Sequence, residues 1–365
     1  MLQKALVLVL VLASIASCIG CGSTANHYVY ATLPSANELA AYREDPNSGV
    51  LTQIAGSPYS VGDGARALVL HPSGKFLYVA NPGQNENDIS LFTIASNGAL
   101  SEVFPRTPIG ASASVPELLA MDPAGGYLYV ANVGSNNISV FSIDSGSGAL
   151  TQIAGSPFPV GLVPLNMQLT PSGNYLFVSA SSTPLGFIAT LSVSAGALQT
   201  VSLTHSDGTT PQGLAIDPSG SYLYVGNTVQ SNSISTFAIG SSGSLNEVHG
   251  SPLNDGYSDP LMLILDPKGQ YLYVANQGSS NVAVYSISSS TGLPAPLITS
   301  TSTFAFSTES SPSFLAEDPN GNYLFVGNQG SSGFGIQAFG VNGGNLNPLF
   351  TYRVGNAPTS IAVLQ

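Results

Sequence analysis

The chain has 365 residues and a formal net charge of −12, and Asp, Glu, Lys and Arg together make up only 7% of it. Nucleic-acid binding needs clustered Lys and Arg to displace counterions, and the seven basic residues here are scattered, so we expect no nucleic-acid partner. The low charge density favours a neutral ligand or another envelope protein as the partner.

Residues 1–17 have the features of a secretion signal. A single Lys4 precedes the apolar run Ala5–Ala13, which is too short to span a bilayer as an ordinary helix. The segment Ile15–Cys18 resembles the end of a bacterial lipoprotein signal, in which the cysteine is lipidated. The resemblance implies a lipid on Cys18, a tether over residues 18–26, and an extracytoplasmic location in the bacterial cell envelope with the lipid as the membrane contact. An ordinary secretion signal is the alternative.

A string of the form DPxGxYLYVAN recurs along the chain. Its six copies begin at residues 71, 122, 170, 217, 266 and 318, so neighbouring copies are 47–52 residues apart. The octapeptide LTQIAGSP occurs at Leu51–Pro58 and again at Leu150–Pro157, two such periods later. A repeat of this length is typical of propeller blades.

Each unit predicts four short strands joined by turns. In the unit over residues 116–160, the strands are PELLAM, YLYVAN, NISVFSI and ALTQIA, separated by DPAG, VGSN and DSGSG. The third turn of every unit contains a glycine, which gives seven units: Gly49, Gly98, Gly148, Gly196, Gly243, Gly292 and Gly344. No stretch shows sustained helical periodicity, so the sequence predicts an all-β seven-bladed propeller with four-stranded antiparallel blades.

The two ends of the chain complement each other in this scheme. Residues 27–32 (HYVYAT) form a second strand without a first, and residues 357–365 (APTSIAVLQ) form a first strand with nothing after it. We expect the C-terminal strand to complete the N-terminal blade, because closure of the ring removes exposed sheet edges. The propeller is then one domain over residues 27–365, and we expect a monomer.

The YVAN and YLYVGN strings in blades of this length are similar to the YVTN-type repeats of the seven-bladed propeller lactonase family. That family includes propeller-type 6-phosphogluconolactonases and fungal muconate cycloisomerases. The resemblance implies a lactone hydrolase, in which Arg66 would polarise the lactone carbonyl and Glu117 would activate water.

Ligand-binding candidates follow from the start of the innermost strands. Five units have a proline seven residues before the turn proline, where a propeller's channel meets its upper face: Pro116, Pro164, Pro211, Pro260 and Pro312. Ala65 and Pro358 hold the matching positions in the other two units. The polar residues next to these seven positions are the predicted ligand-binding residues of the channel mouth: Arg66, Glu117, Gln212, Asp259, Ser313 and Thr359. Arg66 and Glu117 lie on adjacent blades, so we expect them to pair.

Other reactive side chains have structural explanations. The aspartates of the DPxG strings and His71 occupy turn positions, where a side chain bonds to the turn backbone. His27, His205 and His249 lie at strand ends away from the predicted channel. Residues 84–90 (QNENDIS) have the acids and amides of a calcium loop, but we expect a solvated loop. The chain has no GxSxG or HExxH motif, and its two cysteines, Cys18 and Cys21, lie at the processing site, so we expect no metal site and no cofactor.

The sequence therefore favours a non-catalytic, lipid-anchored propeller that binds a neutral ligand or partner. Two alternatives stay open. One is a lactone hydrolase, supported by the family resemblance, and the other is a structural envelope protein with no ligand.

Overall fold

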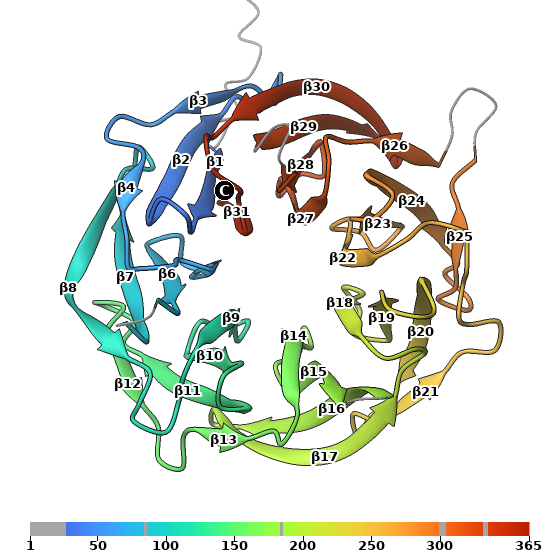
Figure 1. Ribbon diagram of the computed structural model, residues 1–365, viewed down its shortest axis with the longest axis horizontal. Coiled ribbons are helices and arrows are strands. Elements are labelled where there is room, and N and C mark those ends of the chain that lie inside the picture. Colours follow the sequence, from blue (N-terminus) through green and yellow to red (C-terminus); the bar gives the residue numbers. More distant parts are fainter. Residues whose placement is uncertain (1–26, 84–85, 183–184, 299–303, 331–334, 365) are drawn as a thin grey trace, which may run out of the picture.

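The computed structural model describes residues 27–364 except 84–85, 183–184, 299–303 and 331–334. Seven antiparallel sheets stand around a central opening (Figure 1). Every assigned element of the described chain is a β-strand, so the predicted all-β seven-bladed propeller is confirmed. No helix in this part of the chain has the length and apolar character needed to cross a membrane. The predicted signal peptide (1–17), the tether (18–26) and the lipidation site Cys18 lie outside the described residues.

Each blade has four main strands, and blade 1 is the one that contains both ends of the chain. The innermost strands of blades 1 to 7 are β31 (Ser360–Leu364), β5 (Ala67–Leu70), β9 (Pro116–Met121), β14 (Val163–Leu169), β18 (Pro211–Ile216), β22 (Pro260–Leu265) and β27 (Pro312–Glu317). The second strands are β1 (His27–Leu33), β6 (Phe76–Asn81), β10 (Tyr127–Asn132), β15 (Tyr175–Ser182), β19 (Tyr222–Asn227), β23 (Tyr271–Asn276) and β28 (Tyr323–Asn328). The third strands are β2 (Glu38–Glu44), β7 (Asp88–Ile94), β11 (Asn137–Ile143), β16 (Leu185–Ser194), β20 (Ser233–Ile239), β24 (Asn281–Ile287) and β29 (Gly335–Asn342). The outermost strands are β3 (Leu51–Gln53), β8 (Leu100–Pro108), β12 (Leu150–Gln152), β17 (Ala197–His205), β21 (Leu245–Glu247), β25 (Pro294–Pro296) and β30 (Asn345–Arg353). Three short strands also pair with the third strands of blades 1, 3 and 6: β4 (Tyr59–Ser60), β13 (Phe158–Pro159) and β26 (Ala305–Ser307).

The second strand of a blade is its most buried part, which explains its continuous apolar sequence. Every residue of β6 and of β28 is buried, because the neighbouring blades cover both faces of each sheet. The outermost strands are much more exposed, and in β17 only Leu198 is buried.

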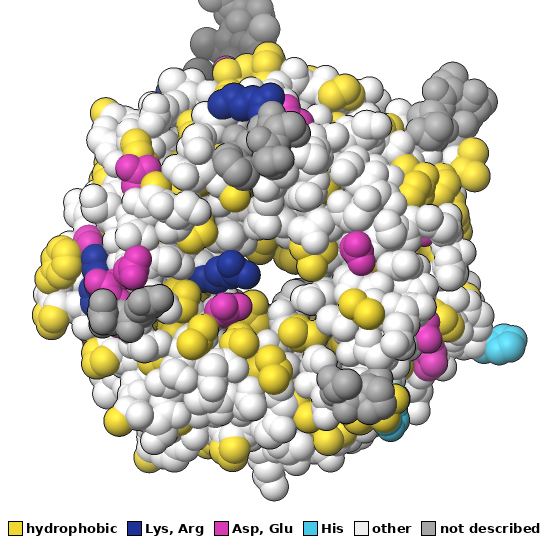
Figure 2. Space-filling view, in the orientation of Figure 1, with side chains coloured by type: hydrophobic (Ala, Val, Ile, Leu, Met, Phe, Trp, Pro, Cys, Tyr) yellow, Lys and Arg dark blue, Asp and Glu magenta, His cyan; other side chains and the backbone are white. Residues whose placement is uncertain are grey.

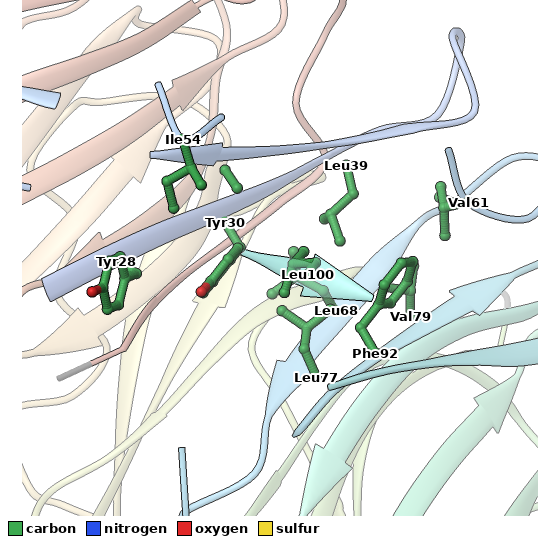
Figure 3. Close-up of a cluster of buried hydrophobic side chains, with 12 residues drawn as sticks. Tyr28, Tyr30, Leu39, Ile54, Val61, Leu68, Leu77, Val79, Phe92 and Leu100 are labelled. Atoms are coloured by element: carbon green, nitrogen blue, oxygen red, sulfur yellow. The ribbon is translucent and has the colours of Figure 1, made fainter. Parts of the chain in front are cut away.

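Apolar side chains fill the seams between neighbouring blades, with one buried cluster at each of the seven seams. Figure 3 shows the seam where Tyr30 and Leu39 of blade 1 pack with Leu77 and Phe92 of blade 2. Full burial of a side chain of this size stabilises the fold by about 1.5–3 kcal/mol. The seams therefore hold the blades in a rigid ring around the channel.

The repeated glycine of the third turn is required by the blade before it. Gly98 has φ +79°, and a Cβ atom there would lie 2.3 Å from Cδ1 of Tyr28. Its carbonyl oxygen accepts a hydrogen bond of 2.9 Å from the hydroxyl of Tyr30. The same bond joins Tyr78 to Gly148, so tyrosine and glycine connect successive blades.

The ring closes through the two ends of the chain, as the split repeat predicts (Figure 1). The C-terminal strand β31 pairs antiparallel with β1, and Ile361 lies opposite Ala31. Ile361 is buried in the seam between blades 7 and 1. The innermost position of blade 1 is thus filled from the other end of the chain.

Candidate functional site

The innermost strands line a central channel whose upper mouth is a cavity of about 410 Å³. A deeper and more apolar chamber of about 570 Å³ adjoins it. The two cavities share six lining residues: Ala67, Leu118, Asn166, Met262, Phe314 and Ser360. They are therefore two parts of one channel, and Figure 2 shows basic and acidic side chains together at the edge of the central opening.

Arg66 and Glu117 face each other across the mouth. Arg66 directly precedes β5, and Glu117 is the second residue of β9 in the next blade. The guanidinium Nε of Arg66 lies 3.9 Å from Oε2 of Glu117, and their side chains are 50% and 32% exposed. An ion pair this open contributes little to the stability of the fold. The expected pairing of Arg66 with Glu117 is therefore observed. Both side chains are also exposed enough to contact a ligand.

Residues from both ends of the chain, together with the neighbouring strand β6, hold the backbone of Arg66 in place. Its N–H donates a 2.9 Å hydrogen bond to the carbonyl of Ala80. Its carbonyl oxygen accepts hydrogen bonds from the hydroxyls of Thr359 at 2.7 Å and Thr32 at 3.3 Å. The two threonine oxygens lie 3.0 Å apart. The junction between the two ends of the chain thus holds the basic residue of the mouth.

Five of the six predicted ligand-binding residues line the mouth: Arg66, Glu117, Gln212, Ser313 and Thr359. Asp259 does not line it. Asp259 has φ +55°. Its N–H donates to Oδ1 of Asn232 at 3.0 Å, and its carbonyl accepts the N–H of Gln277 at 2.8 Å. The structure thus places Asp259 in the loop before β22, and a ligand-binding role for it stays a prediction.

Four polar residues of the mouth were missed from the sequence: Asn166, Gln277, Gln329 and Ser360. Gln277 and Gln329 each follow the asparagine that ends a second strand, β23 or β28, beside the start of the innermost strand. Asn166 lies two residues after Pro164, where other blades place an apolar or small residue. The two glutamines could have been found by aligning the repeats one residue beyond the YVAN string.

The deeper chamber is lined mainly by aliphatic and aromatic side chains. Three of the chain's four methionines line it, namely Met121, Met167 and Met262. Met side chains are flexible and polarisable, so they adapt to apolar ligands of different shapes. Asp266 is the one charged residue among the described residues of the chamber wall.

None of the four histidines lines the mouth or the chamber. His71 is engaged in its turn, where Nδ1 lies 2.8 Å from the hydroxyl of Ser73 and Nε2 lies 2.9 Å from the carbonyl oxygen of Gly125. His205 stacks on Phe187 at the outer side of blade 4. Among the described lining residues of the mouth, Glu117 is the one carboxylate.

The turn aspartates act on their own backbone, as expected. Oδ1 of Asp318 accepts hydrogen bonds from the N–H groups of Asn322 at 2.5 Å and Tyr323 at 2.6 Å. Glu86 belongs to the acidic loop noted in the sequence. Its Oε2 accepts hydrogen bonds from the N–H of Asp63 at 2.6 Å and from Nη1 of Arg106 at 3.0 Å.

Two carboxyl groups outside the mouth and the chamber have strongly raised pKa values. Burial raises the pKa of Glu44 and the pKa of Glu317 to about 8, and neither residue lines the mouth or the chamber.

Comparison with known proteins supports the family expected from the repeat. The family model described as "Lactonase, 7-bladed beta-propeller" matches residues 23–162, 164–250 and 224–306. The chain belongs to this lactonase family. The residues matched by the family model include Arg66 and Glu117, the charged pair at the mouth.

Two curated relatives match parts of this family member. A 6-phosphogluconolactonase of Formosa agariphila is 42% identical over 94 residues, which are 25% of this chain and 26% of that protein. A 6-phosphogluconolactonase of Bacillus subtilis is 27% identical over 141 residues, which are 36% of this chain and 39% of that protein. The matched region thus spans between a quarter and two fifths of these relatives.

Solved structures share the fold over nearly the whole chain. A Bacteroides fragilis propeller is similar with a TM-score of 0.77 and 18% identity, covering 95% of this chain and 100% of the other. The periplasmic gluconolactonase of Pseudomonas aeruginosa gives a TM-score of 0.73 with 19% identity, covering 93% of this chain and 99% of the other. At these identities the likeness shows the fold.

These comparisons correct the functional prediction. The expected non-catalytic binding module is wrong, because the relatives that match in sequence are named lactonases. The absence of a nucleophile motif gave no real support to that prediction. A lactone can be opened by direct attack of water, for which one carboxylate base and one cation near the carbonyl oxygen are sufficient.

Proposed function

We propose that this protein hydrolyses lactones at the mouth of its central channel. The observation that carries the proposal is the Arg66–Glu117 pair. These are the two charged residues among the described residues of the mouth, and they lie 3.9 Å apart in a member of the lactonase family. A carboxylate and a guanidinium at this spacing can reach one carbonyl group from two sides.

The reaction follows from the roles of these two groups. The guanidinium of Arg66 donates hydrogen bonds to the carbonyl oxygen and stabilises its negative charge in the tetrahedral intermediate. Glu117 accepts a proton from the attacking water, whose oxygen bonds to the carbonyl carbon. The ring C–O bond then breaks, and the carboxylic acid of Glu117 returns its proton to the leaving oxygen. The product is the open-chain hydroxy acid.

We propose an uncharged lactone with an apolar part as the substrate class. The mouth offers one cation, and Glu117 neutralises it. A phosphate group would need further donors or cations, and neither cavity contains a second basic residue among its described lining residues. The methionine-lined chamber next to the mouth instead favours an apolar substituent.

Hydrolysis assays on two variants test the reaction. We expect Glu117→Gln to reduce kcat by about 10²–10⁴-fold, because it removes the base. Arg66→Gln should reduce kcat/KM by about 10²–10³-fold, because it removes the charge at the carbonyl oxygen. The substrates are γ- and δ-lactones with alkyl chains of increasing length, gluconolactone and 6-phosphogluconolactone.

The matched control is Glu247→Gln, a change of an exposed glutamate on the outermost strand β21, which should leave turnover unchanged. Melting temperatures of all variants should stay close to that of the parent protein, because the pair is exposed. A parent without activity on any lactone, or Glu117→Gln with full turnover, contradicts the reaction. A preference for 6-phosphogluconolactone over alkyl lactones contradicts the substrate class alone.

We further propose that the protein is exported and anchored in the cell envelope by a lipid on Cys18. The proposal is supported by the apolar run and the small residues before Cys18 in the sequence. We expect Cys18→Ser to remove the protein from the membrane fraction of expressing cells, because the acyl chains supply the affinity. Cys21→Ser is the matched control and should stay membrane-bound. Membrane association of Cys18→Ser equal to that of the parent contradicts the anchor.

A further inference from the structure

Three potential metal ligands meet at the seam where the ring closes. His27 begins β1, Glu44 ends β2, and Asp318 belongs to the turn between β27 and β28 of blade 7. Nδ1 of His27 lies 3.4 Å from Oε2 of Glu44 and 3.8 Å from Oδ2 of Asp318. One ligand atom from each of the three residues lies within 4.8 Å of the others. None of the three residues lines the mouth or the chamber.

All three side chains are buried, and three of their six polar atoms have no hydrogen-bond partner among the described residues. Each of the three residues is 1% exposed. These atoms are Nδ1 of His27 and both carboxylate oxygens of Glu44, and all three are inaccessible to solvent. Leaving such atoms unpaired in the interior is costly, so the cluster requires a partner that the protein itself does not supply.

Comparison between blades shows that Glu44 is a departure from the repeat. Glu44 pairs with His27 at the outer end of the second and third strands. The corresponding residues of the six other blades are all β-branched and aliphatic: Ile94, Ile143, Val193, Ile239, Ile287 and Val341. An aliphatic side chain therefore suits this position, and the fold has no structural need for a carboxylate there.

One carboxylate oxygen of Asp318 is fixed by its own turn, and the other lies near His27. Its Oδ1 accepts the turn N–H groups of Asn322 and Tyr323, which fixes the carboxylate. Its Oδ2 points to His27 and accepts only the N–H of Asn320 at 3.2 Å. The amide nitrogen of Asn320 lies 3.4 Å from Nε2 of His27. With the amide flipped, its oxygen would accept the Nε2–H and direct the lone pair of Nδ1 into the cluster.

We propose that His27, Glu44 and Asp318 form a structural site for a zinc-type divalent cation. Zinc ligands at about 2.0–2.1 Å in a tetrahedron lie about 3.3 Å from one another, close to the separations observed here. A divalent cation neutralises both carboxylates and supplies the partner that Nδ1 of His27 and the oxygens of Glu44 lack. The imidazole ligand favours zinc over calcium or magnesium, which prefer oxygen ligands. The site would connect blade 1 to blade 7.

Metal analysis of the purified protein tests the site. After incubation with Zn²⁺ and removal of the excess, we expect one zinc per chain by mass spectrometry. Glu44→Ile introduces the residue type of the other blades and should abolish zinc retention. His27→Asn should do the same, and it keeps the test valid if Glu44→Ile fails to fold. Asn320→Ala should weaken binding by about 10–100-fold, because it removes the group that orients the imidazole.

His249→Asn is the control for adventitious binding, because His249 is exposed; this variant should retain zinc. A chelator should lower the melting temperature of the parent and of His249→Asn but leave that of Glu44→Ile unchanged. Co²⁺ in place of zinc should give the strong visible absorption of a tetrahedral site in the parent and in His249→Asn, but not in Glu44→Ile. A parent that retains no zinc, or a Glu44→Ile variant that retains as much as the parent, overturns the proposal.

Discussion

Glu317 ends the innermost strand of blade 7, where it pairs with Leu324. The matching residues of the other blades are all apolar: Leu70, Met121, Leu169, Ile216, Leu265 and Val363. Both carboxylate oxygens of Glu317 are buried, and neither has a hydrogen-bond partner in the part of the chain that the structure describes. Burial, followed by the charges of Asp266 and Asp318, raises its pKa to about 8.

We expect Glu317→Leu to stabilise the protein by about 1–3 kcal/mol at pH 7, because it removes an unsatisfied buried polar group. The sign of the pH dependence follows from the raised pKa. Folding favours the protonated carboxyl, so this group costs least below its ordinary pKa of 4.5, and stability is lost as the pH rises through about 8. Thermal melts of parent and variant from pH 4 to 9 should therefore diverge with rising pH and then level off.

Glu317→Gln is the control for this prediction, since an amide keeps the shape of the side chain but cannot ionise. Its stability should lack the pH dependence that the carboxyl produces. Equal pH dependence of parent and Glu317→Leu would show that the carboxyl is solvated in the folded protein.

The residues of the mouth were largely predictable because they sit at a fixed distance from each turn proline. Asp259 was an exception, since its positive φ places it in the loop before the strand. His27, Glu44 and Asp318 were not predicted as a cluster. Asp318 lies 291 residues from His27 in the sequence, and blade 7 meets blade 1 only in the closed ring.

At the scale of strands, the octapeptide LTQIAGSP interrupts the outermost strand of its blade. β3 ends at Gln53, and after the turn that contains Pro58 the short β4 resumes the pairing with β2. The hydroxyl of Ser57 accepts the N–H of Ala41 at 2.8 Å and replaces the missing ladder bond. Ser156 does the same for Val140 in blade 3. The repeated Ser-Pro predicts a turn but not the return of the strand, because the hydroxyl contact depends on the neighbouring strand.

The closing strand β31 contributes to two seams. Ile361 and Val363 pack at the seam between blades 7 and 1. Ala362 and Leu364 pack at the seam between blades 1 and 2. A single short strand thus supports both neighbours of the split blade.

Deletion of residues 357–365 should prevent cooperative folding. It removes backbone hydrogen bonds of roughly 1 kcal/mol each and apolar contacts of up to about 1.5–3 kcal/mol per buried side chain. A typical protein has only about 5–15 kcal/mol of stability to lose. Circular dichroism and thermal melts of the truncated and full chains measure the effect.

Addition of the nine-residue peptide in trans is the positive control, and it should restore part of the folded signal. A truncated chain that melts cooperatively near the temperature of the parent would contradict closure by β31.

For the whole molecule, the blade number and the closure of the ring were predictable from the sequence because both depend on local signals. The third-turn glycine occurs in all seven units, whereas the DPxG-type turn occurs in six, and this difference reveals the blade that is split between the two ends of the chain. The side chains that line the channel were less predictable, because its wall combines residues from all seven innermost strands. The volume and the apolar character of the chamber follow only from the assembled ring.

The placement of β1 between β31 and β2 also has a mechanical consequence. A pull on the chain before His27 acts along β1, which is paired over His27–Leu33 with β2 and over Tyr28–Thr32 with β31. Hydrogen bonds between antiparallel strands run perpendicular to the strands, so this force loads both ladders in shear. Bonds loaded in shear share the force and must break together, whereas a pull at an edge strand breaks them one after another. The strand β1 is thus built to carry tension without opening the ring.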